Sequence, residues 1–518
     1  MNFGGSNMAF IEILSLFPLY FSLTQWVSLI IASILILLIR RTFYWRVRGF
    51  HGPTSLFPFD DAYNQLTKPL CSLQMNTYVK YAPIWGGYQG FEPVLFVADP
   101  KIIKNIFVKD FQDFPETMNA KTTTSQIEQK FITILDGDDW KRVRSAMTRS
   151  FTSGKLKIMF SLVKVSVENT NQRFFAISQE SKRFDPKDFW SEESLNVIAR
   201  SFFATDIVAS GESKSNFLKN FKEALSFSSF RIMLVLTLPK SLAQLFKLTF
   251  IRRTHLDFFE ALVDQIIKNR KQDSHNEAQD FLHNMLENEL ELDSLVEEVN
   301  QELRTMDPSS KKLSKIEIVA SSVIFLLAGT EVTSNLLTWL TYRLAVNPDV
   351  QNRLYKEILE NDIDDYNILI NLPYLDAVVK ESLRIDPPAL ILSRRSRNRY
   401  HVTDTQTIDP ETGIVVPIYA IHHDPKFYPD PDKFSPDRFL PENAEHLIPF
   451  TFLPFGAGPR VCVGMRFALM HTKYAVASVV KKYILTKCDK TPDKPEYSPG
   501  VFALKHEGLE VGIKLRET

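Results

Sequence analysis

Apolar residues along the chain form one long uninterrupted run near the amino terminus and many shorter runs with helical spacing. The stretch between Glu12 and Arg40 contains no charged residue, and residues 26–39 within it are nearly all aliphatic. A helix of about 20 such residues crosses the hydrocarbon layer of a membrane. The pattern therefore predicts one transmembrane anchor within residues 1–40, which is retained because basic residues follow the run instead of preceding it.

The charges on either side of this run predict its orientation. No Lys or Arg precedes it, whereas four arginines lie between residues 40 and 48. Because cytoplasmic ends of membrane helices are rich in basic residues, we expect a luminal amino terminus and a cytosolic remainder. Gly and Pro residues in the basic segment 41–60 break the helix and indicate a short hinge.

Residues 61–518 form one large domain in this interpretation, because no Gly/Ser linker, repeat or low-complexity tract divides them. Helical spacing dominates, and short β-branched or aromatic runs at Tyr88–Val97 and Ile414–Ile418 indicate a few strands. We therefore expect a mainly α fold with small β-sheets. A second apolar region, 230–250, is interrupted by proline and lysine, and it fits either ordinary core or a surface that dips into the membrane.

The longest helical pattern begins at Ser314, where Glu317 completes a capping box, and it runs to Pro348. Its uncharged part, Ile318–Thr330, has 13 residues, which is too short for a membrane span and right for a buried core helix. The middle of this helix contains a glycine that costs about 1 kcal/mol there. It also contains Glu331, a carboxylate among apolar neighbours, which needs a functional reason.

Composition narrows the class of protein. The 61 Lys and Arg residues balance the 61 Asp and Glu residues, which argues against a nucleic-acid binder because such proteins need a basic excess. Only three cysteines occur, Cys71, Cys462 and Cys488. They are too few and too scattered for a disulfide framework or a Cys-rich zinc site, and they fit a reducing compartment.

One of these cysteines lies in a turn with distinctive chemistry. Residues 454–464 read PFGAGPRVCVG, and a helical pattern follows them. The glycines permit a tight turn and the close approach of a flat ligand, and the amino end of the next helix favours a thiolate at Cys462. The turn resembles the haem loop of the cytochrome P-450 family, F-x-x-G-x-R-x-C-x-G, at Phe455, Gly458, Arg460, Cys462 and Gly464.

This resemblance implies the cytochrome P-450 fold and a bound haem b, that is, iron protoporphyrin IX. Cys462 would be the axial thiolate of the iron, which pushes electron density toward O–O cleavage. The resemblance assigns cofactor binding to Trp140, Arg144, Arg394, Phe455, Arg460 and Gly464. It assigns a structural brace on the thiolate side to Glu381, Arg384 and Arg438.

The middle of the long helix, residues 328–334 (AGTEVTS), resembles the oxygen-binding segment of the family, A-G-x-[DE]-T. The resemblance implies a kinked groove over the iron, with Glu331 as an acid that relays protons. One position differs, because Val332 stands where the family usually has an alcohol directly after the acid. Thr330 and Thr333 are the neighbouring candidates for the missing hydroxyl, although Thr333 points about 100° away around the helix.

Further segments, 85–100, 140–157 and 465–470, are similar to the animal microsomal clan of drug-oxidising and detoxification enzymes. That similarity implies a monooxygenase of the endoplasmic reticulum membrane that oxidises bulky apolar small molecules with O₂. Its electrons would come from NADPH through NADPH-cytochrome reductase, and cytochrome b5 is another candidate partner. The same similarity predicts a pocket lined by parts of 113–135, 226–240, 324–333, 388–393 and 499–504.

Basic residues around the expected haem loop suggest where a reductase docks. Opposite charges speed the encounter of two proteins, so Lys141, Arg142, Lys155 and Lys157 are candidates for a docking surface. An ordinary solvated face is an equally good interpretation of the same residues.

Two other functions stay open. A haem-thiolate isomerase or dehydratase would rearrange a peroxide without a reductase; Val332 favours it, and turnover without NADPH would reveal it. A membrane-tethered haem sensor without turnover is the second alternative. Its mark would be a six-coordinate haem that no substrate converts to high spin.

Overall fold

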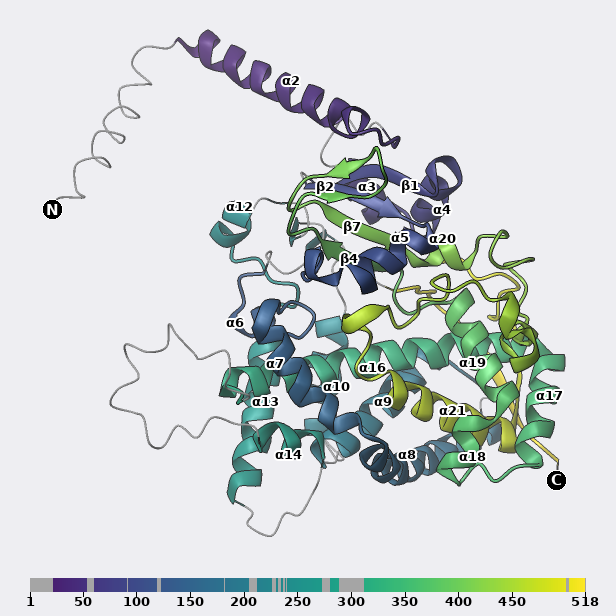
Figure 1. Ribbon diagram of the computed structural model, residues 1–518. Coiled ribbons are helices and arrows are strands. Elements are labelled where there is room, and N and C mark those ends of the chain that lie inside the picture. The colour runs from purple at the N-terminus through teal and green to yellow at the C-terminus, as the bar shows by residue number, and fades with distance from the viewer. Residues whose placement is uncertain are drawn as a thin grey trace.

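Helices make up most of the molecule, and the largest described sheet lies beside the amino-terminal helix (Figure 1). The structure described is a computed structural model. The described residues are 22–53, 60–90, 92–118, 123–180, 182–204, 212–225, 230–231, 234–235, 238, 240–272, 280–287, 312–499 and 503–517. The predicted mainly α fold with small β-sheets is confirmed.

The helices of the first half surround the middle of the molecule. They are α2 (Leu23–Val47), α3 (Asp60–Thr67), α4 (Leu70–Tyr81), α5 (Pro100–Lys104), α6 (Gln126–Gln129), α7 (Gly137–Thr148), α8 (Ser153–Gln179), α9 (Pro186–Phe203), α10 (Glu212–Leu225), α12 (Lys240–Leu245), α13 (Arg253–Gln272) and α14 (Phe281–Leu286). The helices of the second half are α16 (Lys315–Val346), α17 (Pro348–Leu359), α18 (Tyr366–Asn371), α19 (Pro373–Ile385), α20 (Ile418–His422) and α21 (Met465–Lys482).

The largest described sheet has the strand order β1-β2-β7-β4, with β1 (Ile84–Gln89), β2 (Glu92–Val97), β7 (Gly413–Pro417) and β4 (Ile391–Arg395). The strand predicted at Tyr88–Val97 is therefore the end of one hairpin strand and all of the next. The second predicted strand begins one residue earlier, at Gly413, and Ile418 already starts α20. Smaller sheets join β3 (Arg183–Phe184), β9 (Val511–Leu515) and β8 (Tyr483–Thr486), and pair β5 (Tyr400–His401) with β6 (Thr407–Ile408).

The central helix is α16, which matches the long helix predicted from Ser314. The Ser314 side chain and the Glu317 carboxylate form the predicted capping box at its start. It is long and apolar enough to cross a membrane, but it is mostly buried inside the domain and packs against α9, α13 and α21. This helix is therefore core, as its short uncharged stretch predicted.

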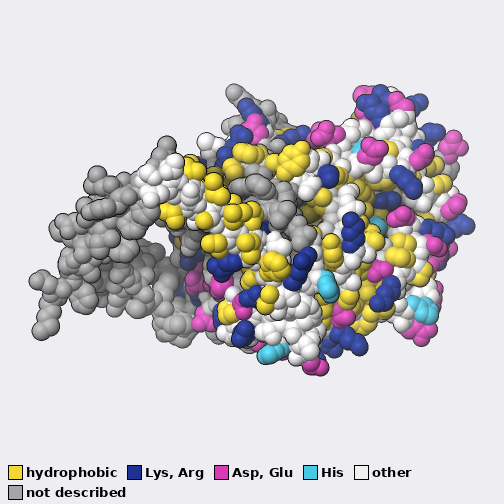
Figure 2. All heavy atoms as spheres, turned by 90° about the horizontal axis from the view of Figure 1, so that it is seen from above, with side chains coloured by type: hydrophobic (Ala, Val, Ile, Leu, Met, Phe, Trp, Pro, Cys, Tyr) yellow, Lys and Arg dark blue, Asp and Glu magenta, His cyan; other side chains and the backbone are white. Residues whose placement is uncertain are grey.

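The other long apolar helix is α2, and its surroundings are different. Most of its aliphatic side chains are exposed, and Figure 2, which looks down on the molecule, shows a hydrophobic band along it. Its length and composition fit a membrane span. The helix continues past residue 40 to Val47, so the first residues of the expected hinge 41–60 are helical; residues 54–59 lie outside the described part.

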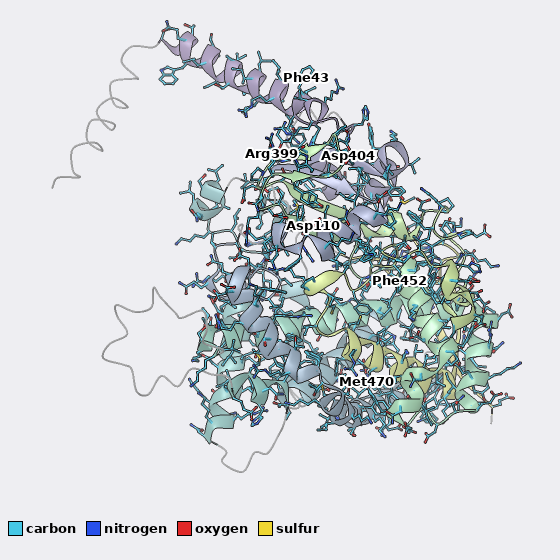
Figure 3. All side chains as sticks on the ribbon, in the orientation of Figure 1. Phe43, Asp110, Arg399, Asp404, Phe452 and Met470 are labelled. Atoms are coloured by element: carbon cyan, nitrogen blue, oxygen red, sulfur yellow. The ribbon has the colours of Figure 1, made fainter. Side chains whose placement is uncertain are left out.

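The last turns of α2 pack onto the body of the domain. Trp45 is buried against the first sheet and donates its indole N–H to the Gly87 carbonyl at 2.7 Å. A side chain at Gly86 would collide with the Trp45 ring, so this close approach requires glycine there. Phe43 points to the outside of the same helix in Figure 3 and is half exposed. One face of the helix end is thus built into the domain.

The apolar region 230–250 is described only in part. Its described helix, α12, exposes Leu242 and Leu245, and Phe246 is exposed just beyond its end. In Figure 1, α12 lies on the same left side as the amino-terminal half of α2. The contact of this region with a membrane stays a prediction.

Candidate functional site

The turn that carries Cys462 lies between a short 3-10 turn at Gly458–Arg460 and α21. The Cys462 N–H donates to the Phe455 carbonyl at 2.9 Å, which closes the loop. Gly458 has φ +71°, and a side chain there would collide with the Phe107 carbonyl. Figure 3 labels Phe452 on the chain that enters this turn and Met470 on α21, which leaves it. The sequence pattern therefore produces one fixed loop against the body of the domain.

The Cys462 thiol is surrounded by protein yet reached by solvent. Burial raises its pKa, whereas hydrogen bonds from the Gly464 and Met465 N–H groups and the nearby Arg144 charge oppose that rise. The side chain is nevertheless exposed, and a side chain added at Gly464 would meet open space. The sulfur therefore accepts hydrogen bonds from N–H groups at the start of α21 and is reached by solvent. Such a sulfur is suited to bind the metal of a flat cofactor.

Three arginines predicted to bind the cofactor lie close enough to influence one another. Burial, together with the charge of Arg460, lowers the pKa of Arg394 to about 9. Burial lowers the pKa of Arg460 to about 10, although the charges of Asp136 and Glu116 oppose it and Arg144 adds to it, and burial also lowers the pKa of Arg144. None of the three forms an ion pair with a carboxylate among the described residues, so the site favours a bound anion.

The surroundings of these arginines support that conclusion. Arg394 is buried in β4, stacks over the Phe107 ring at 4.5 Å, and has an unpartnered Nε atom. Arg460 lies 4.4 Å over the Trp140 ring and donates to two backbone carbonyls, those of Pro115 and Leu135, at 2.7 Å each. Guanidinium groups with donors to spare are suited to carboxylates, such as the two propionates of haem.

The middle of α16 presents one exposed stripe inside an otherwise buried helix. Ala328 and Val332, one turn apart, are exposed, and Val332 is 41% exposed. Thr330 is 0% exposed and Thr333 is 3% exposed, so both hydroxyls are packed away from this stripe. The Thr330 hydroxyl has no hydrogen-bond partner there. The helix therefore offers an apolar surface, not a hydroxyl, at the position where the family segment has its alcohol.

Glu331 points to α9. Its Oε2 accepts a hydrogen bond from the Lys187 ammonium at 2.8 Å, and the same ammonium lies 3.0 Å from the Ser334 hydroxyl. Both members of the ion pair are partly exposed. Lys187 stands in the first turn of α9, whose start is fixed by Pro186 and the Asp185 cap. The predicted relay acid thus has a cation beside it that reaches solvent.

The predicted brace is assembled on the other side of the turn. Arg384 and Glu381 form a fully buried bidentate pair at 2.8 and 2.9 Å, one turn apart on α19. Arg438 adds a longer contact of 3.4 Å to the same carboxylate. Arg384 also donates to the His422 carbonyl at 2.7 Å, and His422 Nε2 accepts the Leu453 N–H at 3.0 Å. The chain entering the cysteine loop is held through this network.

The docking of a reductase at the basic residues stays a prediction, and the structure narrows it at one residue. The Arg142 side chain is mostly buried against the start of α16, where its guanidinium contacts both Glu317 oxygens at 2.7 and 2.8 Å. Lys155 contacts the Asn284 side chain, and Lys157 lies over the Tyr366 ring. Arg142 is therefore a structural residue, because its charge is already engaged inside the protein.

Sequence reasoning missed Lys187, Phe107 and His422. Each acts through a partner far away in the sequence, and no local motif marks it. The helical spacing of residues 100–109 predicts that Phe107 packs in the core. Its position under the Arg394 guanidinium depends on the tertiary fold, so the sequence did not indicate it.

A cysteine sulfur facing an accessible space, with buried arginines for an anionic flat ligand, indicates a haem-thiolate protein on a mainly helical fold. The family model "Cytochrome P450" matches residues 57–513. The chain belongs to the cytochrome P450 family.

Relatives of the chain support a narrower placement. It is 33% identical over 482 residues to cytochrome P450 3A9 of Rattus norvegicus, covering 91% of this chain and 92% of that protein. It is also 33% identical over 486 residues to cytochrome P450 3A13 of Mus musculus, with the same coverage. Lithocholate 6-beta-hydroxylase of Mesocricetus auratus is 31% identical over 488 residues, 92% of this chain and 94% of that protein. These findings place the chain in clan 3, among haem-thiolate monooxygenases.

Proposed function

We propose that this protein is a membrane-anchored monooxygenase of the endoplasmic reticulum that oxidises bulky, apolar small molecules. The substrate R–H, O₂, NADPH and one proton would yield R–OH, water and NADP⁺. Electrons would arrive from NADPH through a separate reductase on the cytosolic side. The anchor α2 and the basic residues after it support this location and orientation.

The observation that carries the proposal is the accessible sulfur of Cys462 in its fixed loop, and the exposed apolar stripe of α16 supports it. Haem bound through this sulfur would supply the oxygen chemistry. Cys462 would hold the iron, and Trp140, Arg144, Arg394 and Arg460 would bind the propionate side, with Phe455 and Gly464 lying against the ring. Ala328 and Val332 would offer an apolar surface to a substrate and keep water from its reacting carbon.

Proton supply is the second task of the chain. Glu331 would deliver a proton from the Lys187 side, since Lys187 contacts both the carboxylate and solvent. Thr330 and Thr333 stay candidates for a supporting hydroxyl, although both are buried in this structure. Glu381, Arg384 and Arg438 would keep the cysteine loop in position.

The test is the spectrum of the reduced protein with carbon monoxide. We expect a strongly red-shifted Soret band that is lost in Cys462→Ser and retained in Cys71→Ser and Cys488→Ser, because only a thiolate opposite carbon monoxide causes this shift. Reductase and NADPH should then oxidise members of a diverse apolar compound set. A band that survives the loss of Cys462 would overturn the assignment.

A haem-thiolate isomerase or dehydratase is a second candidate, favoured by the exposed Val332. A valine at the stripe provides no hydroxyl to protonate bound oxygen, and a peroxide rearrangement needs none. Conversion of an organic hydroperoxide to an isomerised product without reductase would favour this candidate. Product formation that requires both NADPH and reductase would exclude it.

A further inference from the structure

Glu128, in the short helix α6, is a buried carboxylate that none of the steps above uses. It is 0% exposed, and the cation that acts on it among the described residues, Arg231, forms no ion pair with it there. Its oxygens accept the Thr123 hydroxyl, the Phe250 N–H at 3.2 Å and the Ile251 N–H at 2.8 Å. An acidic group in such a place is costly, so it calls for a purpose.

The carboxylate joins two segments that are far apart in the sequence. One is 123–131, which contains α6, and the other is the turn 247–251 between α12 and α13. A second link lies beside it, since the N–H and hydroxyl of Thr124 both donate to the Leu248 carbonyl, at 3.2 and 2.9 Å. Glu128 is the acceptor that the described structure gives to the Phe250 and Ile251 N–H groups, so one side chain satisfies two backbone donors of this turn.

The location of this clamp connects it with the substrate space. The segment 123–131 belongs to an expected wall of the pocket, and α6 packs against α16, the helix with the exposed stripe. The turn 247–251 follows α12, whose end exposes large apolar side chains. Figure 1 shows α12, α6 and α13 along one edge of the molecule. The clamp thus ties a pocket wall to the apolar surface beside it.

A small set of hydrogen bonds joins the two segments in the described structure. They are the two from the Phe250 and Ile251 N–H groups to the Glu128 carboxylate and the two from Thr124 to the Leu248 carbonyl. Burial also raises the pKa of Glu128, although the Thr123 hydroxyl, the two N–H groups and the Arg231 charge oppose the rise. Because segments joined by few contacts are the ones that open in native proteins, this junction is suited to an entrance.

We propose that Glu128 is a positioning residue for substrate entry: its carboxylate holds segment 123–131 against the turn 247–251, and releasing it opens the pocket wall to bulky apolar molecules. The effect on substrates rests on the proposed function, whereas the clamp itself does not.

Three variants separate the clamp from general stability. Glu128→Gln keeps the size of the side chain but leaves one amide oxygen for two N–H donors, and its own NH₂ group opposes the second donor. Glu128→Asp keeps both carboxylate oxygens on a side chain that is one methylene shorter. It is the conservative variant, which should preserve part of the clamp. Thr123→Val removes only the hydroxyl that orients the carboxylate. Glu360→Gln, at an exposed carboxylate after α17, is the matched control.

Hydrogen exchange of the full-length holoprotein in detergent tests the clamp directly. In Glu128→Gln, peptides covering 123–131 and 247–252 should exchange about tenfold faster than in the wild type, while α16 and α21 stay unchanged. Glu128→Asp and Thr123→Val should show smaller increases in the same peptides, and Glu360→Gln none. Unchanged exchange at 247–252 in Glu128→Gln would overturn the proposal, and so would equal acceleration throughout the domain.

Ligand release tests the entrance. A bulky azole that ligates haem should dissociate about tenfold faster from Glu128→Gln, while the small ligand imidazole dissociates at the wild-type rate. For a compound that the protein oxidises, the KM of Glu128→Gln should rise, while its kcat should stay near the wild-type value. Equal effects on both azoles would show that Glu128 does not control entry. Loss of the carbon monoxide band in every protein would instead refute the proposed function and leave the exchange result standing.

Discussion

Lys187 on α9 forms an ion pair with Glu331 on α16, with the ammonium 2.8 Å from the carboxylate oxygen. The two residues are 144 positions apart, and the extensive packing of α9 on α16 brings them together. The Ser334 hydroxyl accepts a hydrogen bond from the same ammonium at 3.0 Å and donates one to the Glu331 backbone carbonyl at 3.1 Å. The acid expected to relay protons is thus held by a lysine that is in contact with solvent.

Replacing this lysine should impair proton supply. We expect Lys187→Met to lower product formed per NADPH consumed by about tenfold and to release hydrogen peroxide, because general acid assistance is worth about 10²–10⁴-fold. The solvent isotope effect on kcat should be larger in Lys187→Met than in the wild type. Lys187→Arg should keep most of the coupling. Lys222→Met removes an exposed lysine paired with Asp188 and is the control. Normal coupling in Lys187→Met would show that protons arrive by another route.

The Arg142–Glu317 pair should contribute to stability in a pH-dependent way. Burial alone would raise the pKa of Glu317, but the Arg142 guanidinium and the Ser314 N–H together hold it below its usual value. A carboxyl group with a lowered folded-state pKa stabilises the protein above its unfolded-state pKa of about 4.3, and this stabilisation is lost as the pH falls further.

Thermal unfolding between pH 7 and about pH 3 tests this pair, because the stabilisation is lost below the unfolded-state pKa of about 4.3. Arg142→Met should lower the unfolding free energy by about 3 kcal/mol at pH 7, because it leaves the buried Glu317 carboxylate with the more distant Lys130 ammonium, at 3.7 Å, as its remaining charged partner. Glu317→Gln should lower it less and should lose part of the decline toward acid pH. Lys141→Met, on the exposed side of the same helix, is expected to change little. If the stability of Glu317→Gln depended on pH as that of the wild type does, Glu317 would not be the source of this pH dependence.

The end of α2 predicts where the chain tolerates truncation. Deleting residues 1–40 leaves Trp45 and Phe50 in their buried positions against the first sheet, so the haem spectrum and melting temperature should stay close to wild type. Deleting residues 1–50 removes both side chains and should lower stability by about 3–5 kcal/mol, as would Trp45→Ala. Melting curves of the three proteins measure this. Equal melting temperatures for both truncations would show that the contact contributes nothing.

Local patterns predicted the features whose partners are close in the sequence. The Ser314 capping box, the Glu381–Arg384 pair and the loop around Cys462 each lie within a few residues, so spacing alone indicated them. Arg142 was assigned to a docking surface because its partner Glu317 is 175 residues away. Helix packing brings this pair together, and one sequence without its fold does not reveal such packing.

The last prediction concerns Val332, which stands in the exposed stripe of α16 with no hydroxyl to offer. Val332→Thr has nearly the same shape and adds a hydroxyl that can donate a hydrogen bond into this space. We expect product formed per NADPH to rise about twofold or more and hydrogen peroxide release to fall.

Two features decide how this result is understood. The introduced hydroxyl can also bond to the Ala328 carbonyl one turn earlier, as threonines in helices do, which limits the gain but does not reverse it. Val332→Ala changes the volume without adding a hydroxyl, so it should not improve coupling. Because Thr330 and Thr333 are both buried, an improvement only in Val332→Thr would show that the native helix lacks a donor at this surface. Equal coupling in all three proteins would show that Glu331 with Lys187 already supplies the proton.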